Sequence, residues 1–117
     1  METDITTPEQ LALEWLALVD QGRGAESWDA AASHFRRAVS DAQWAAAMNG
    51  VRAPLGAVAS RSLKSEQRAT ELPGAPDGEY AVLQFASSFE HKRTAVETVT
   101  MMRDTDGRWR ASGYFIR

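Results

Sequence analysis

Cysteine is absent from this chain of 117 residues, which excludes disulfide bonds, thiolate catalysis and zinc sites built on cysteine. Long hydrophobic runs are absent too, since no stretch approaches the roughly 20 apolar residues that span a bilayer. The opening residues METDITTPEQ place acids where a signal peptide carries basic residues, and they contain no apolar core. We therefore expect a soluble protein, cytoplasmic or periplasmic, with no membrane partner. An export signal removed ahead of Glu2 remains an open alternative.

Histidine is also scarce, and the basic side chains form no concentrated stripe. The two histidines, His34 and His91, lie far apart, and neither has an acid at metal-ligand spacing, so we expect no metal. The formal net charge is -3. Residues 1–51 carry three basic and eight acidic side chains, and residues 52–117 carry ten and eight. A nucleic-acid partner is not expected, because no concentrated basic stripe occurs. No glycine-rich phosphate loop or nucleophile elbow is present, and no cofactor is expected.

Helical periodicity covers the chain up to about residue 54. The first predicted helix begins at a capping box with Thr7 as its N-cap and ends at Gly22. A second helix is predicted from one apolar stripe. The third begins at a capping box of Ser40 and Gln43 and ends before Pro54. Because each helix carries an aromatic anchor at helical spacing, we interpret the stripes as core. They comprise Leu11, Trp15, Leu18 and Val19; Trp28, Ala31, Ala32, Phe35 and Val39; and Trp44, Ala47, Met48 and Val51.

The last forty-five residues alternate their side chains at period two, which is typical of antiparallel strands. A poorer pattern from about residue 55 to 72 predicts an extended arm, and residues 72–80, with two prolines and two glycines, predict a loop. Helices followed by strands indicate an α+β domain. We therefore predict one domain over residues 1–117, with three N-terminal helices packed on a curved antiparallel sheet of about four strands.

The turn at residues 106–107 sets the register of the last hairpin. A two-residue turn would place Arg103 opposite Arg110, and like charges across strands are unfavourable. A three-residue loop with Gly107 in the left-handed conformation separates a polar face from an apolar one, so we predict that loop. Its polar pairs are Asp104 with Arg108, Thr100 with Ser112 and Thr98 with Tyr114; the opposite face pairs Met101 with Ala111, Val99 with Gly113, and Arg103 with Trp109.

Glu97 is the only acid in the middle of the predicted apolar face. A preceding loop at residues 91–93 would align it with Ser87 and Phe115 across three strands. A buried glutamate can act as a general base, because desolvation raises its pKa. Alternatively it is a structural carboxylate paired with Arg61 or hydrogen-bonded to Ser87, since buried charges are usually paired; we favour this interpretation. The predicted core contains Trp15, Trp28, Trp44, Phe85, Val99 and Phe115.

Six short strings along the chain carry a resemblance: SW at 27–28, QW at 43–44, PLG at 54–56, LPGAPDGEY at 72–80, ETVT at 97–100 and GRWRASGYFIR at 107–117. Together they resemble the bacterial domain of unknown function 4019, over nearly the whole chain. The resemblance implies a cystatin-like cone, similar to the nuclear transport factor 2 superfamily, in which helices pack into a curved sheet. It also implies that no activity is assigned, and that many relatives begin with an export signal.

Two classes of function are compatible with these features. The first is a non-catalytic module that binds a small apolar ligand or a protein partner in the mouth of the cone. The second is an isomerase- or dehydratase-like enzyme with Glu97 as general base. An enzyme would bring several titratable groups to one cavity, so we favour binding. The candidate ligand-binding residues are Glu97, Arg61, Ser87 and Tyr114. A homodimer through the polar strand face, with Thr98, Thr100, Ser112 and Tyr114, is also expected.

Overall fold

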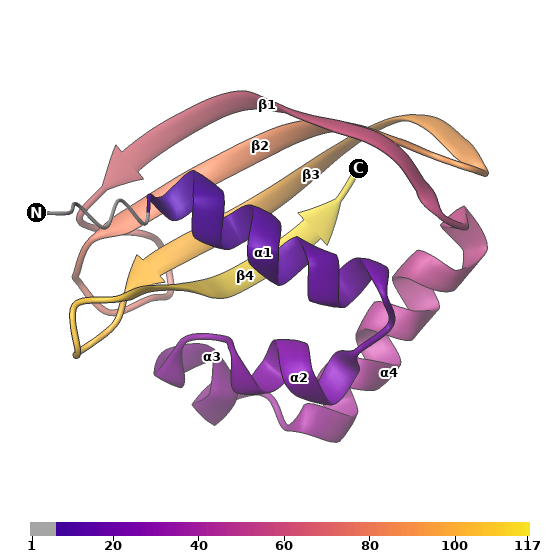
Figure 1. Ribbon diagram of the computed structural model, residues 1–117. Coiled ribbons are helices and arrows are strands. Elements are labelled where there is room, and N and C mark those ends of the chain that lie inside the picture. Colours follow the sequence, from indigo (N-terminus) through magenta and orange to yellow (C-terminus); the bar gives the residue numbers. More distant parts are fainter. Residues whose placement is uncertain (1–6) are drawn as a thin grey trace, which may run out of the picture.

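The computed structural model describes residues 7–117, and it contains helices followed by a four-stranded sheet (Figure 1). The predicted α+β class is therefore confirmed. No helix in this part of the chain is both long and apolar enough to cross a membrane. The elements are α1 (Pro8–Asp20), α2 (Gly24–Asp29), α3 (Ser33–Ala38), α4 (Asp41–Arg52), the 3-10 turn η1 (Ala53–Leu55), β1 (Val58–Ala69), β2 (Tyr80–Phe89), β3 (Lys92–Arg103) and β4 (Trp109–Ile116).

Both predicted helix starts are confirmed by side-chain caps. The Thr7 hydroxyl accepts a hydrogen bond from the Gln10 amide at α1, and Ser40 and Gln43 form a complete capping box at α4. Gly22, at φ +72°, follows the end of α1 in the left-handed conformation that favours glycine. These local signals fix where the helices begin and end before any tertiary contact is considered.

The predicted single second helix is wrong, because the chain breaks into α2 and α3. Ala32 is extended and donates its amide to the Ala111 carbonyl of β4 (2.8 Å). The Asp104 carboxylate then accepts from the amide and hydroxyl of Ser33 (3.0 and 2.8 Å), and so caps α3 from the β3–β4 turn. Tertiary hydrogen bonds therefore replace the helical ones at the break.

The four strands form an antiparallel meander in the order β1-β2-β3-β4. The sheet is strongly curved, and the helices lie on one of its faces (Figure 1). The core fills the space between them and contains four of the six predicted core residues as buried side chains; Trp28 is partly buried and packs against it. The central members are Ala12, Trp15, Leu16, Val19, Trp44, Met48, Leu83, Phe85, Val99 and Met101.

The register of the last hairpin agrees with the prediction only near its turn. Arg103 lies opposite Trp109 and Met101 opposite Ala111, as predicted. The register then shifts by one residue, so that Thr98 lies opposite Phe115 instead of Tyr114. The other displaced pairs are Thr100 with Gly113 and Val99 with Tyr114. The extra residue forms a β-bulge in β4, and a bulge reverses the alternation of every residue beyond it.

The bulge exchanges the positions of two aromatic side chains. Tyr114, predicted on the polar face, turns into the core and contacts Trp15 and Trp44 at centroid distances of 5.7 and 6.4 Å. Phe115, predicted in the core, is 51% exposed. The prediction for Phe115 is therefore wrong, because β4 has one extra residue, Ser112, between the pairs Met101–Ala111 and Thr100–Gly113.

The β2–β3 register also differs from the prediction, but by two residues. Glu97 lies opposite Phe85 instead of Ser87, because the turn falls at Glu90 and His91 and the ladder then shifts by one residue between the pairs Phe89–Lys92 and Ser87–Ala95. A displacement of two residues leaves each side chain on its predicted face. Glu97 and Ser87 therefore still face the core together, as diagonal neighbours.

Candidate functional site

Glu97 is fully buried in the middle of β3, with an exposed fraction of 0%. Its neighbours on the inner face are the apolar residues Phe85 and Val99, which are also fully buried. An isolated carboxylate in such surroundings would cost several kcal/mol. The protein must therefore surround this charge with donors.

Three side chains from three strands supply those donors. Arg61 of β1 binds both carboxylate oxygens of Glu97, through Nε at 2.7 Å and Nη2 at 3.1 Å. The Ser87 hydroxyl donates to Oε1 at 2.6 Å, and the Tyr114 hydroxyl donates to Oε2 at 2.5 Å. The structure thus brings together all four residues that the sequence singled out. The Arg61 pairing and the Ser87 hydrogen bond, both predicted, are present.

The network continues to the ends of two helices. Asp20, the last residue of α1, receives two hydrogen bonds of 2.9 Å from Arg61 and one of 2.9 Å from Arg52 of α4. Two arginines and two acids alternate, so the buried cluster has no net formal charge. It ties α1, α4, β1 and β3 together through bonds of defined direction.

Arg52 is the least satisfied member of this cluster. It is 8% exposed, and its Nε and Nη1 have no hydrogen-bond partner in residues 7–117. Its guanidinium lies over the ring of Phe89, 4.7 Å from the centroid. A cation–π contact compensates part of the desolvation of these nitrogens.

The charges of the network shift the pKa values of its members. Burial acts to raise the pKa of Asp20, but hydrogen bonds and charges from Arg61 and Arg52 outweigh it and hold that pKa below its usual value. Burial acts to lower the pKa of Arg61, but the hydrogen bonds and charges of Asp20 and Glu97 outweigh it and raise that pKa. Burial and the Glu97 carboxylate raise the pKa of Tyr114 far above its ordinary value. Tyr114 therefore stays protonated at neutral pH, and its hydroxyl donates a hydrogen bond to Glu97.

This geometry holds a charge but leaves no free basic oxygen. Both Glu97 oxygens accept hydrogen bonds from neighbouring side chains, and the residue is fully buried. A general base must lie within hydrogen-bond reach of the proton it removes. The arrangement therefore suits a structural anion that orients Arg61 and Tyr114.

Asp20 and Arg52 were not predicted as members of the site. Each one follows a buried apolar residue at a spacing of four, Asp20 after Leu16 and Arg52 after Met48. That spacing places both on the inward stripe of their helices. The sequence therefore contained one signal for this part of the site: the apolar stripe of each helix ends in a charged residue, an acid in α1 and a base in α4.

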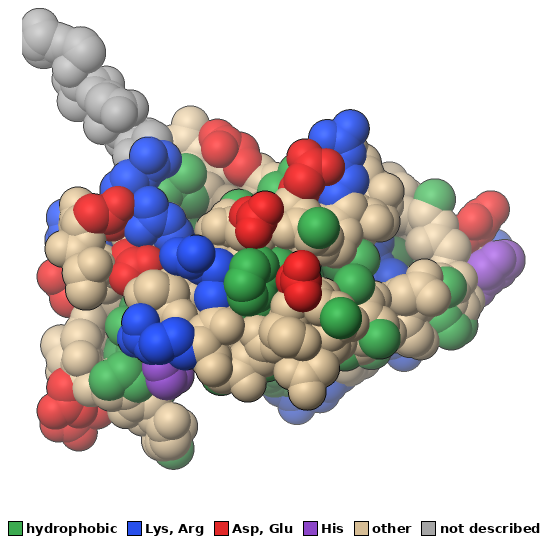
Figure 2. All heavy atoms as spheres, turned by 90° about the horizontal axis from the view of Figure 1, so that it is seen from below, with side chains coloured by type: hydrophobic (Ala, Val, Ile, Leu, Met, Phe, Trp, Pro, Cys, Tyr) green, Lys and Arg blue, Asp and Glu red, His purple; other side chains and the backbone are tan. Residues whose placement is uncertain are grey.

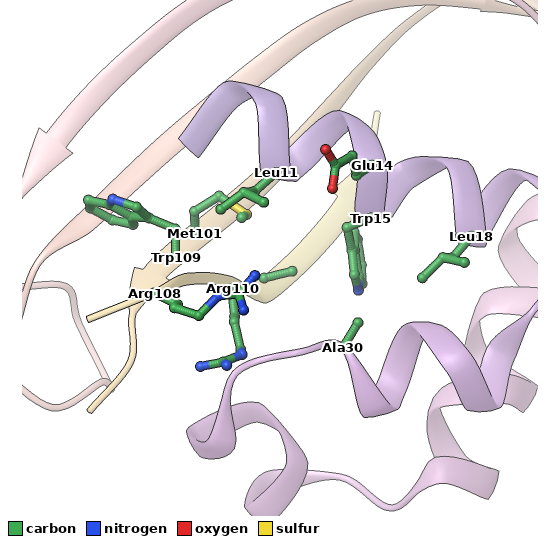
Figure 3. A pocket seen from close by; sticks show the side chains of 10 residues that line it. Leu11, Glu14, Trp15, Leu18, Ala30, Met101, Arg108, Trp109 and Arg110 are labelled. Carbon is green, nitrogen blue, oxygen red and sulfur yellow. The ribbon is translucent and has the colours of Figure 1, made fainter. Parts of the chain in front are cut away.

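A surface groove lies apart from the network, between α1 and β4. It has a volume of about 270 Å³. Figure 3 shows Leu11, Trp15 and Leu18 on α1 facing Ala30 and the start of β4 across it. The remaining lining residues are Glu14, Met101, Arg108, Trp109, Arg110 and Ala111. The groove is largely apolar, with arginines at one end and a single acid, Glu14, on the helix wall.

The charged surface near this groove is uneven. Figure 2 shows lysine and arginine side chains gathered in the left half of the helix-covered face, directly beside hydrophobic ones. The two histidines lie at opposite ends of the molecule in this view. Across residues 7–117, no group of three or more His, Asp or Glu side chains is placed to hold a metal ion.

The fold and the buried cluster define a small α+β domain, with N-terminal helices on one face of an open, curved antiparallel sheet. The chain belongs to the family described as "Protein of unknown function (DUF4019)", whose model matches residues 11–114. No curated protein and no solved structure matches the chain.

Proposed function

We propose that this domain is a non-catalytic binding module that holds a small apolar ligand in the groove between α1 and β4. One contrast carries the proposal. Glu97, the acid in the middle of the inner face of the sheet, is closed to solvent and fully paired, whereas an apolar groove stands open at the surface. Ligand sites are typically concave and mostly apolar, with a few polar groups that fix orientation.

The groove favours a compact ligand with an aromatic or branched apolar body. Its volume of about 270 Å³ lies just below the range of about 300–1,000 Å³ that is typical of small-molecule sites. Trp15 and Trp109 supply flat apolar walls, and Arg108 and Arg110 stand at one end. Arg110 is already engaged by Asp104 and Asp106. Arg108 is therefore the residue proposed to contact a polar group of the ligand.

A fluorescent apolar probe tests this proposal. We expect 8-anilinonaphthalene-1-sulfonate to bind the folded protein with enhanced emission. The variant Ala30→Trp should abolish this binding, because Ala30 is exposed and lines the groove. Ala25→Trp is the matched control, since Ala25 is an exposed residue of α2 that does not line it. Equal binding by both variants would show that the groove is not the site.

The alternative, an isomerase- or dehydratase-like enzyme using Glu97, requires that a substrate reach this carboxylate. Carbodiimide coupling to an amine, read by mass spectrometry, measures that access. We expect modification of exposed carboxylates such as Glu14 and none of Glu97 in the folded protein. Modification of Glu97 at the rate of Glu14 would mean that the core opens, and would favour the enzyme.

We also propose a homodimer through the face of the sheet that carries no helices. Two complete rows across the four strands contain no charged side chain on this face, so burial of these two rows would leave no charge unpaired. Their members are Gln67, Val82, Thr100 and Gly113, and Ser65, Gln84, Thr98 and Phe115. Paired sheets of this kind would also suit a cystatin-like scaffold.

Light scattering tests the dimer. We expect twice the monomer mass at high micromolar concentration, and a monomer for Gln84→Arg, which places a charge in the middle of that face. Ala46→Arg, on the exposed side of α4, should leave the mass unchanged. A monomeric natural protein at high micromolar concentration would contradict the proposal.

A further inference from the structure

Strand β4 forms one edge of the sheet, and its outer side has free backbone groups near its end. Arg117 and Val96 exchange two backbone hydrogen bonds of 3.0 Å. Hydrogen-bonded and non-hydrogen-bonded pairs alternate along an antiparallel ladder. Tyr114 and Ile116, which lie opposite Val99 and Glu97, therefore direct their N–H and C=O groups away from β3. Within residues 7–117, no loop or helix supplies a backbone partner for these four groups.

Earlier on the same edge, one backbone group is covered by another segment of the chain. The Ala111 carbonyl accepts the Ala32 amide from the segment between α2 and α3. Natural proteins usually cover or blunt an edge strand, because unpaired strand groups are a template for pairing with another chain. No such contact covers the stretch from Tyr114 to Ile116 within residues 7–117.

A second groove, of about 180 Å³, runs between this open edge and α4. Val51, on the helix wall, is 47% exposed. Phe115, which belongs to a row of the helix-free face, also borders the groove at the strand edge, and it is 51% exposed. The residues that line this groove include no acidic or basic side chain. The charge recorded beside it is Arg117, whose guanidinium lies over the Phe115 ring, 5.8 Å from the centroid. The full lining is Trp44, Ala47, Met48, Val51, Tyr114, Phe115 and Ile116.

We propose that this second groove binds an extended, uncharged segment of another protein, which adds to the sheet as a fifth strand. The segment would satisfy the free N–H and C=O groups of Tyr114 and Ile116, and every second side chain would pack against α4. This inference rests on the proposed function as a binding module and names a class of partner. An uncharged segment fits, because the walls offer no counter-charge to a buried ionic group.

The helix wall favours a single extended segment over a second copy of the domain. A strand added to β4 lies about 4.8 Å from it, and α4 occupies the far side of that space. In a symmetric β4–β4 pair each copy would bring its own α4 to this contact, so two helices would meet beside the strands. A peptide segment carries no such obstacle.

The probe for the test is an acetylated and amidated pentapeptide of alternating threonine and valine. In an amide NMR titration we expect shifts centred on Tyr114 and Ile116, with hydrogen exchange at these two amides slowed by about tenfold or more at saturation. With the valine side chains facing α4, the valine N–H groups point at Tyr114 and Ile116. The same peptide with both valine nitrogens methylated loses these donors, and it should not bind. Equal binding of the two peptides would overturn the proposal.

Two pairs of variants locate the site on the protein. Val51→Glu adds a charge to the helix wall at an exposed position, and should weaken peptide binding by about tenfold, whereas Ala46→Glu, also exposed on α4, should not. Ile116→Pro removes an outward N–H, and should weaken binding relative to Ile116→Val. Unchanged affinity in Val51→Glu would contradict the proposal even if Ile116→Pro proved poorly folded.

Self-association and the first groove give independent outcomes. If the protein alone dimerises and the peptide competes with that dimer, the occupant is a second copy and the proposal is wrong. If the peptide fails while the fluorescent probe still distinguishes Ala30→Trp from Ala25→Trp, only the strand partner is refuted. The binding function proposed for the groove between α1 and β4 then stands.

Discussion

Replacement of Glu97 by glutamine tests the buried network most directly, because it removes the charge and keeps the shape. The carboxylate accepts two hydrogen bonds from Arg61 and one each from Ser87 and Tyr114. A glutamine side chain has one carbonyl oxygen, and its amino group cannot accept a hydrogen bond. Donors on one of the two carboxylate oxygens therefore lose their acceptor, and Arg61 keeps only Asp20 as an ionic partner.

The expected loss of stability is about 3 kcal/mol. Hydrogen bonds to charged groups contribute about 1.5–3 kcal/mol each, and removal of one partner of a buried ion pair costs about 3–5 kcal/mol. Arg61 keeps its contact with Asp20, and the Tyr114 hydroxyl can rotate. We therefore expect the cost of Glu97→Gln to lie at the lower end of the range for a buried ion pair. With an unfolding entropy of about 2.1 cal/mol/K per residue, this loss lowers the Tm by roughly 12 °C.

Urea unfolding followed by tryptophan fluorescence measures this loss. The matched control is Glu66→Gln, the same substitution in an exposed ion pair with Arg68 on β1, which should cost about 0.5 kcal/mol. A loss of about 2 kcal/mol or more for Glu97→Gln supports the structural role. A loss no larger than that of the control would refute the reasoning, and would favour a site in which Glu97 faces a ligand.

Three further predictions concern the same cluster. Arg61→Met should lower the free energy of unfolding in urea by about 3–5 kcal/mol, because it removes a partner from two acids. Arg52→Met should cost clearly less, because two Arg52 nitrogens are unpaired and Asp20 keeps its contact with Arg61. Equal losses would contradict this ranking. Tyr114→Phe should cost about 1–2 kcal/mol through the hydrogen bond lost at Glu97, and an unchanged midpoint would exclude that contribution. The pKa of Asp20 is lowered from 3.8 on folding, so the unfolded chain binds this proton first as the pH falls, and stability should decline from about pH 4 downward. Urea unfolding at a series of pH values should lack this part of the pH dependence in Asp20→Asn. An acid profile unchanged by the substitution would contradict the prediction.

The ion pair at Glu97 was predictable because burial energetics leave few alternatives. Alternation placed one acid on an apolar face, and a buried carboxylate must be paired or neutral. Arg61 lies on the preceding extended segment, and the structure confirms it as the partner. The two-residue error in the β2–β3 register did no harm, because it preserved the face.

Asp20 and Arg52 entered the site through the packing of α1 against α4 and the sheet. Helical spacing shows that both point inward, but no periodicity states which helix ends meet. Their ion pair depends on the three-dimensional arrangement of segments that are distant in the sequence.

The sequence by itself determined the order of elements, the helix caps and the class of the fold, because caps, apolar stripes and strand alternation act over a few residues. Only the tertiary structure decided the break at Ala32 and the bulge in β4. The first depends on a hydrogen bond to the Ala111 carbonyl. The second inserts one residue without a local marker, and it thereby turns Tyr114 toward Glu97 and Phe115 toward solvent.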